Sequence, residues 1–287
     1  MRLTASVVYL AIDDLLPHEG PIASGVEELL GKLTHAGIPC VWLTSQTRLQ
    51  IDAPRRKLGH RDPFIAEDGC GVYLPEDYFH LRPQSPRAGS ARGRPSSDAP
   101  TMRLGRFTCL PVAQRQPAAS EALEELAAET GVSVVPLQSL PPRQLAQNTG
   151  LRPREAELAR QRDFDEVFFF AGAPAEQIDS FAAAARSHGM QLRPHGALWS
   201  LAIGADPAKC VRELTKLYDR ALHAHAKSIG VGIGENPQAF LSACDRNVFM
   251  TTQDTDDGAV RPRGVLKVPL NSADPWERLA DFLLEPR

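Results

Sequence analysis

The fold of this chain is decided by one stretch, Ser6-Val7-Val8-Tyr9-Leu10-Ala11-Ile12-Asp13-Asp14-Leu15-Leu16. The apolar run from Val7 to Ile12 is followed directly by two carboxylates. A short apolar run closed by polar residues is typical of a strand that is buried on both faces of a parallel sheet. In open α/β sheets, ligands bind beyond the carboxyl ends of the strands. Asp13 and Asp14 therefore fall where chemistry is expected, unless they only cap the next turn.

A second strand end is predicted to bring polar groups to the same edge. Apolar residues at helical spacing over residues 22–33 predict a helix that ends near Gly37. Residues 38–43 then read as a second buried strand, and Thr44-Ser45-Gln46-Thr47 follows it. Hydroxyl and backbone N–H groups at such a position can hold an oxyanion such as phosphate, or they can cap the following helix.

The composition divides the chain into two parts. Residues 82–100 are rich in Pro, Ser, Gly and Arg, which predicts a surface loop or a disordered insertion. The next hundred residues have an α+β pattern, and a βαβ pattern returns after residue 203. We therefore expect an α/β fold with a doubly wound, Rossmann-like parallel sheet as its core, formed by residues 1–81 and 204–287. Residues 82–203 are expected to form an inserted α+β cap domain.

The overall composition excludes several classes of protein. The net charge of −3 gives no general attraction to nucleic acid or to an anionic membrane. The 5 cysteines include no CxxC pair, which argues against a disulfide framework or a structural zinc site. The first apolar run is too short for a signal peptide, and no stretch approaches membrane-spanning length. We expect a cytoplasmic protein without a nucleic acid or membrane partner.

Four motifs carry a resemblance to a known family. They are VWLTSQTR at 41–48, FIAEDG at 64–69, TGL at 149–151 continuing to EAELARQRDFDE at 155–166, and GIGENP at 232–237. With these motifs the chain resembles the haloacid dehalogenase superfamily and, within it, the mannosyl-3-phosphoglycerate phosphatase family, which has an inserted α+β cap. The resemblance implies a small phosphorylated ligand, such as a sugar phosphate or a phosphoglycerate conjugate.

The resemblance also implies a mechanism. Such phosphatases use an aspartate nucleophile and an acid/base aspartate two residues later, in a D-x-D-G-T motif. The first carboxylate attacks phosphorus and the second protonates the leaving oxygen. Magnesium and a lysine neutralise the phosphoryl charge, and acidic residues after the Gly-rich strand hold the metal.

This sequence departs from the family at the nucleophile. One register places Leu10 at the nucleophile position and Ile12 at the acid/base position. A shift by one residue places Ala11 and Asp13 there instead. Neither register supplies a nucleophilic carboxylate, so the sequence favours a pseudophosphatase.

The charge-neutralising motifs are altered as well. The family's lysine falls at Pro207, with Lys209 two positions further on. The metal-binding acids become Glu235 and Ala239, so we expect poor Mg²⁺ binding. A helix is expected after Asn236, and its N-terminus would attract an anion.

Two hypotheses follow from these motifs. In the first, the protein binds a phosphorylated sugar-like ligand, or regulates a protein partner, without turnover. In the second, it is a magnesium-dependent phosphomonoester hydrolase whose nucleophile has moved to Asp13 or Asp14. The candidate catalytic residues are Asp13, Asp14, Thr44 and Lys209. The candidate ligand-binding residues are Ser45, Arg48, Glu67, Asp68 and Asn236, and the candidate metal ligands are Asp13 and Glu235.

Overall fold

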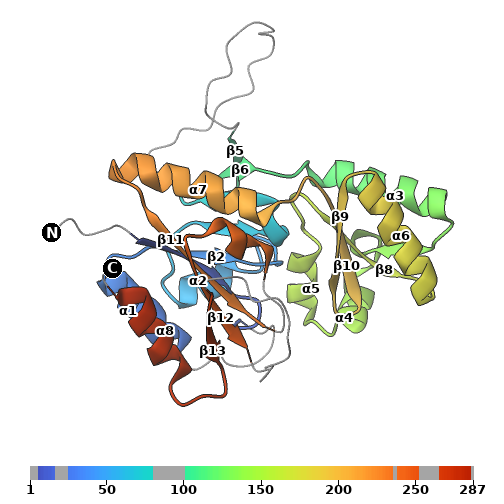
Figure 1. Ribbon diagram of the computed structural model, residues 1–287. Helices are drawn as coiled ribbons and strands as arrows, with labels where there is room; N and C mark the ends of the chain where they lie inside the picture. Colours follow the sequence, from blue (N-terminus) through green and yellow to red (C-terminus); the bar gives the residue numbers. More distant parts are fainter. Residues whose placement is uncertain (1–5, 17–24, 80–100, 235–237, 252–264, 286–287) are drawn as a thin grey trace, which may run out of the picture.

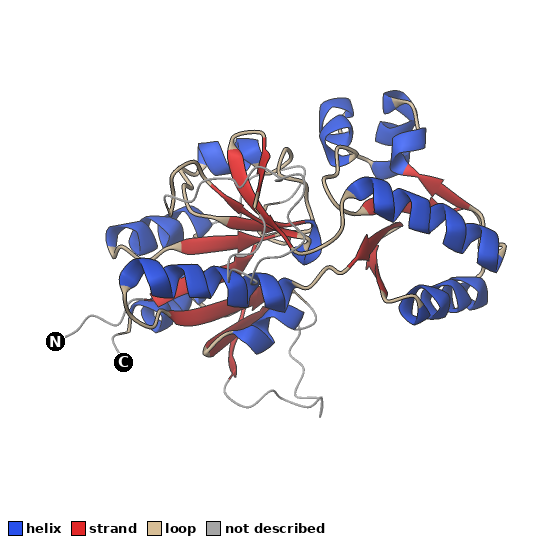
Figure 2. Ribbon diagram, turned by 90° about the horizontal axis from the view of Figure 1, so that it is seen from above, coloured by secondary structure: helices blue, strands red, loops and turns tan. Residues whose placement is uncertain are grey.

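A computed structural model describes residues 6–16, 25–79, 101–234, 238–251 and 265–285. These residues form a nine-stranded sheet and a four-stranded sheet, which lie in two separate lobes (Figures 1 and 2). The expected insertion at residues 82–100 lies outside the described residues.

The predicted first strand lies inside the large sheet. β1 (Ser6–Ala11) runs parallel to β2 (Cys40–Leu43) on one side and to β11 (Lys227–Ile233) on the other. Both of its faces are buried, as its apolar run predicts, because Tyr9 and Leu10 point to opposite faces and are 0% and 1% exposed. The sheet order is β13-β12-β11-β1-β2-β3-β4-β6-β5. Its other strands are β3 (Phe64–Ala66), β4 (Gly71–Leu74), β5 (Met102–Leu104), β6 (Phe107–Pro111), β12 (Arg246–Thr251) and β13 (Val265–Pro269).

Helices cover both faces of the large sheet. α1 (Val26–His35) and α8 (Pro275–Leu284) lie side by side on the face that Leu10 enters (Figure 1). α7 (Pro207–Leu222) and the 3₁₀ helix η3 (Ala239–Ala243) pack on the face that Tyr9 enters. A further short helix, α2 (Asp52–Lys57), follows β2. The architecture is the expected doubly wound α/β core, and its β1–β11 pairing joins the two ends of the chain in one sheet.

The second lobe is an antiparallel sheet with helices on both faces, which fits a cap domain. Phe168 packs with two helices on one face, and its neighbour Val167 lies in the apolar cluster on the other. The sheet order is β7 (Val134–Pro136), β8 (Glu166–Phe170), β10 (Leu198–Ile203) and β9 (Met190–His195). The helices are α3 (Gln116–Thr130) and α6 (Ala175–Ser187) on the Phe168 face, with α4 (Pro142–Thr149), α5 (Pro153–Ala159) and the 3₁₀ helix η2 (Leu137–Ser139) near Val167.

The residues of β5 and β6 were assigned to the cap, but both strands extend the large sheet. β6 pairs antiparallel with β4, and its Phe107 and Cys109 are buried in the core. The two connections to the cap meet just beyond it, where the N–H of Gln114 donates to the carbonyl of Ile203 at 2.9 Å. We therefore propose that the cap comprises residues 114–203 and that the core includes β5 and β6.

Three other elements differ from expectation. The helix expected after Asn236 is the five-residue 3₁₀ helix η3, which is too short to form an anion site at its N-terminus. Strands β9 and β13 were not predicted from the sequence.

Candidate functional site

A cavity of about 280 Å³ lies at the carboxyl ends of β1, β2 and β11, against the cap. Parallel strands bring their carboxyl ends to one edge, so residues far apart in the sequence meet here. Polar side chains from both lobes line the cavity. The lining includes Ala11, Asp13, Asp14, Thr44, Asp68, Arg193, Pro207, Gln238 and Ala239.

The end of β1 shows which of the two registers the fold adopts. Leu10 and Ile12 are each 1% exposed and pack into the core on the α1 and α8 face. Ala11 and Asp13 alternate with them and line the cavity. The fold therefore presents the Ala11 methyl group where the resemblance places the nucleophile, and a methyl group cannot attack phosphorus.

The Asp13 carboxylate is bound by the groups that were expected to hold phosphate. Its Oδ1 accepts a hydrogen bond from the Thr44 hydroxyl, and its Oδ2 accepts one from the Ser45 N–H at 2.8 Å. Asp13 is open to the cavity but otherwise surrounded by protein, which raises the pKa of its carboxyl. The Thr44 and Ser45 hydrogen bonds oppose this increase, whereas the nearby Asp68 carboxylate adds to it.

Asp14 lines the cavity together with Asp13, although adjacent residues on a strand would point to opposite faces. The reason is that β1 ends at Ala11 and a turn follows, in which the N–H of Leu15 donates to the carbonyl of Ile12 at 2.9 Å. The Asp14 carboxylate lies against Gly234, where a Cβ would approach its Oδ2 to 2.9 Å. Both carboxylates therefore face the same space.

The turn η1 (Glu67–Gly69) between β3 and β4 connects the cavity to the cap. Glu67 and Asp68 have φ values of 51° and 53°, which are costly for residues with a side chain. Gly69 has φ +89°, and a Cβ there would lie 2.4 Å from the backbone nitrogen of Pro207. The strained turn directs Asp68 into the cavity and Glu67 towards the cap.

Two cap residues on β9 meet Asp68. Arg193 donates from Nη1 to the Asp68 carbonyl, and the same nitrogen lies 3.7 Å from Asp68 Oδ1. His195 Nε2 lies 3.0 Å from Asp68 Oδ2. Burial opposes protonation of His195, but the Asp68 carboxylate outweighs it and raises the pKa of His195. Burial alone would raise the pKa of Asp68, but His195 and Arg193 hold it below its usual range.

Glu67 fastens the core to the cap. Its side chain is 0% exposed, and its carboxylate accepts hydrogen bonds from the backbone N–H groups of Asp163, Phe164 and Asp165 at 2.8–3.2 Å. Burial, reinforced by the Asp165 carboxylate, raises the pKa of Glu67 to about 8. Glu67 was expected to bind a ligand, but the structure places it in this joint.

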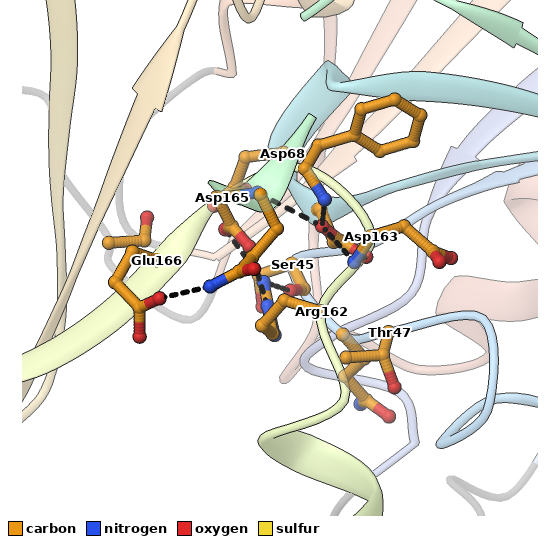
Figure 3. Close-up of polar contacts among 12 residues, drawn as sticks. Ser45, Thr47, Asp68, Arg162, Asp163, Asp165 and Glu166 are labelled. Carbon is orange, nitrogen blue, oxygen red and sulfur yellow. Dashed lines mark hydrogen bonds and ion pairs between the residues drawn. The ribbon is translucent and has the colours of Figure 1, made fainter. Parts of the chain in front are cut away.

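Arginines complete the joint between the lobes. Arg162 forms a paired contact with the Asp165 carboxylate at 2.6 and 2.7 Å and donates to the Ser45 carbonyl at 2.9 Å (Figure 3). Arg48 was expected to bind a ligand, but its Nε lies 2.7 Å from Asp163 Oδ2. These contacts link the segment that follows β2 to the cap segment that precedes β8.

The remaining predicted residues lie elsewhere. Lys209 is exposed on the first turn of α7, where its N–H donates to Asp206 Oδ1, and it does not line the described part of the cavity. Pro207 lines the cavity in its place. Glu235 and Asn236 lie outside the described residues.

The described residues of the cavity do not supply a donor set that fits the magnesium ion implied by the resemblance. Among the described residues, no group of three or more His, Cys, Asp or Glu side chains could hold a metal. Asp13 is engaged by Thr44 and Ser45, and Ala239 brings only a methyl group to the cavity. Magnesium requires several oxygen ligands in near-octahedral geometry, so we derive no step through a metal.

Neither Arg193 nor His195 was among the candidate site residues predicted from the sequence. The structure shows both on β9, two residues apart, so that they share one face of the strand. Two basic residues at positions i and i+2 could have indicated a shared cationic face. This inference depends on predicting a strand at β9, because i and i+2 lie on one face only in a strand.

Comparisons with known proteins add an independent line of evidence. No family model matches the chain. A glucosyl-3-phosphoglycerate/mannosyl-3-phosphoglycerate phosphatase of Methanococcoides burtonii is 24% identical over 243 residues, which cover 83% of this chain and 82% of that protein. A mannosyl-3-phosphoglycerate phosphatase of Pyrococcus furiosus is 26% identical over 242 residues, which cover 83% of this chain and 88% of that protein.

Solved structures show the same fold. A haloacid dehalogenase-like hydrolase from Bacteroides thetaiotaomicron superposes with a TM-score of 0.59 at 12% identity, over 97% of this chain and 98% of that chain. A haloacid dehalogenase-like hydrolase from B. subtilis superposes with a TM-score of 0.57 at 14% identity, over 97% of this chain and 98% of that chain.

The large sheet, the inserted cap and the cavity between them define a protein with the haloacid dehalogenase fold. Within that superfamily, the chain resembles the mannosyl-3-phosphoglycerate phosphatase family at modest identity, as its motifs predicted. Over the part of the chain that the structure describes, no helix is long and apolar enough to cross a bilayer.

Proposed function

We propose that this protein is a catalytically impaired relative of sugar-phosphate phosphatases, which binds a small phosphorylated sugar-like molecule without hydrolysing it. The observation that carries the proposal is the end of β1, where Ala11 lines the cavity in place of a nucleophile. Removing a covalent nucleophile typically costs an enzyme several orders of magnitude in rate. A retained cavity without a nucleophile supports binding, and through binding a regulatory role towards a partner.

The cavity supports a ligand of this class in two ways. Its volume of about 280 Å³ is close to the lower end of the range for small-molecule sites. It also combines polar groups from the core, such as Thr44, with a cation from the cap, Arg193. The relatives in the comparison act, by their names, on mannosyl-3-phosphoglycerate or its glucosyl analogue. We therefore infer a sugar phosphate or a phosphoglycerate conjugate as the ligand, and a cytoplasmic location where such metabolites occur.

A second function is favoured by one specific observation. Asp13 and Asp14 both line the cavity, so two carboxylates face the space that a ligand would enter. A hydrolase in which one of them attacks phosphorus is therefore the alternative. Either Asp13 or Asp14 is a candidate for that nucleophile.

Isothermal titration calorimetry with mannosyl-3-phosphoglycerate, with and without magnesium, tests the binding proposal. We expect saturable binding that needs no magnesium and that weakens in Thr44→Val, which loses a hydroxyl at the cavity. Ser139→Ala, a change at a hydroxyl in η2 of the cap, serves as the matched control. Absence of binding to mannosyl-3-phosphoglycerate and to a panel of sugar phosphates would contradict the proposal.

A further inference from the structure

We propose that Arg193, carried by the cap strand β9, supplies the positive charge that the ligand's phosphate group contacts. This inference rests on the proposed function, because it names the group that selects an anionic ligand at the same site. Of the described residues that line the cavity, Arg193 is the only one with a permanent positive charge. Three aspartates, Asp13, Asp14 and Asp68, line it as well.

The position of Arg193 is fixed by the core. Its Nη1 donates to the carbonyl of Asp68, at the strained turn between β3 and β4. The side chain is 29% exposed, so most of it is shielded by protein. A guanidinium has five N–H donors, and the observed contact to Asp68 uses one of its nitrogens. The remaining donors suit an oxyanion, which guanidinium groups bind with two parallel hydrogen bonds.

The charges around Asp68 leave Arg193 available to a ligand. The nearest charged contact of the Asp68 carboxylate on β9 is His195, with its Nε2 at 3.0 Å from Oδ2, whereas Arg193 Nη1 is 3.7 Å from Oδ1. His195 therefore takes the closer ion pair, and Arg193 is held mainly through the Asp68 backbone carbonyl. Because an attraction between charges falls with distance, the longer pair neutralises Arg193 less.

The negative charge at the cavity floor makes this cation necessary for an anionic ligand. A phosphate dianion near Asp13 and Asp14 is repelled by both carboxylates unless a positive group lies between or beside them. The donors of Thr44 and Ser45 cannot supply that charge, and they are bound to Asp13. Arg193 is the side chain that offsets this negative charge from the cap side of the cavity.

A purely structural role for Arg193 makes a different prediction. If its contact with Asp68 only held the cap against the core, its loss would weaken the binding of charged and uncharged ligands alike. A charge role affects the phosphorylated ligand alone. A cation introduced elsewhere in the cavity would then restore part of the affinity. Pro207 offers that position, because it lines the same cavity from the core side.

The experiment compares affinities for mannosyl-3-phosphoglycerate by calorimetry in four variants whose folding is first checked by thermal unfolding. We expect Arg193→Gln to lose roughly tenfold or more in affinity, equivalent to one lost charge-assisted contact. Arg193→Lys should retain most of the affinity, and Arg193→Gln with Pro207→Lys should regain part of it. Arg186→Gln, at an exposed arginine on the cap helix α6, should bind like the wild type.

Three outcomes overturn the inference. Wild-type affinity in Arg193→Gln, while the wild type binds, contradicts the charge role and leaves the proposed function intact. If Arg193→Gln does not fold, Arg193→Lys provides the test. A folded Arg193→Lys variant that loses as much affinity for mannosyl-3-phosphoglycerate as Thr44→Val does would contradict the charge role. No binding by the wild type overturns the proposed function and this inference together.

Discussion

The carboxylate of Asp13 accepts a 2.8 Å hydrogen bond from the backbone N–H of Ser45, and its other oxygen accepts one from the hydroxyl of Thr44. A side chain at the end of β1 thus occupies the donors at the end of β2. A phosphate group that enters this end of the cavity must share these donors or displace Asp13. The ionisation of Asp13 is therefore expected to control the affinity for anions.

Asp13→Asn should strengthen binding of mannosyl-3-phosphoglycerate and raise the melting temperature at neutral pH. The raised pKa of Asp13 means that folding disfavours its ionised form, a penalty that is present above its unfolded-state pKa and absent well below it. The amide removes the charge but keeps an oxygen that can accept from Ser45. Calorimetry and thermal unfolding at pH 7 and near pH 3 measure both effects. Weaker binding, or equal stabilisation at both pH values, would contradict this reasoning.

His195→Gln should remove a pH-dependent stabilisation of roughly 1 kcal/mol, typical of a partly buried ion pair. The raised pKa of His195 makes its contribution complete below the ordinary histidine value and lost as the pH rises through the raised value. The lowered pKa of Asp68 makes its contribution present above its ordinary value of 3.8. Urea unfolding at pH 5.5 and pH 8.5 should therefore show a difference in the wild type that shrinks in the variant. An unchanged difference would show that the Asp68–His195 pair is not its source.

Gly69→Ala should destabilise the protein by about 3 kcal/mol or more, since it combines backbone strain with a clash. Gly69 has φ +89°, and the new Cβ would lie 2.4 Å from the nitrogen of Pro207. Gly131 is a matched control, because it has φ +67° and nothing within 4 Å of a built Cβ. Its substitution by alanine should cost only about 1 kcal/mol. Similar losses in the two variants, measured by chemical denaturation, would argue against a tight contact between η1 and α7.

Glu67→Ala should cost about 3 kcal/mol or more, because it leaves three buried N–H donors of residues 163–165 without their acceptor. Glu124→Ala, at an exposed position of α3, controls for the loss of a glutamate and should be nearly neutral. Chemical denaturation gives both values. If Glu67→Ala retained wild-type stability and lost only ligand binding, the role of Glu67 in joining the lobes would have to be abandoned.

The fold of the core could be predicted from the sequence, because the patterns that indicate its strands and helices are local. The run from Val7 to Ile12 predicts a strand buried on both faces, and helical spacing over residues 22–33 predicts α1. The place of β6 was not predictable in this way, because its partner β4 is separated from it by residues 75–106 and the strand pattern does not specify a partner.

The candidate site was predictable only in part. The positions of Asp13, Thr44 and Asp68 at strand ends and in a turn follow from the sequence pattern. Arg193 reaches Asp68 across 125 residues of sequence, and this contact depends on how the cap docks. The docking of the cap depends on Glu67 and its neighbours. Their motif resembles that of the family, but residue spacing does not predict which cap residues they contact. Residues that act through long-range contacts therefore required the structure.

The most direct test of the central claim is the turnover of mannosyl-3-phosphoglycerate and of a panel of phosphomonoesters, measured as phosphate release with magnesium present. Wild type, Asp13→Asn and Asp14→Asn are compared at matched concentrations of folded protein. Because Ala11 lies at the nucleophile position, we predict release near the uncatalysed background in all three proteins, while the wild type still binds the phosphorylated ligand. Robust wild-type turnover that is abolished in Asp13→Asn or Asp14→Asn would contradict the claim and identify the relocated nucleophile.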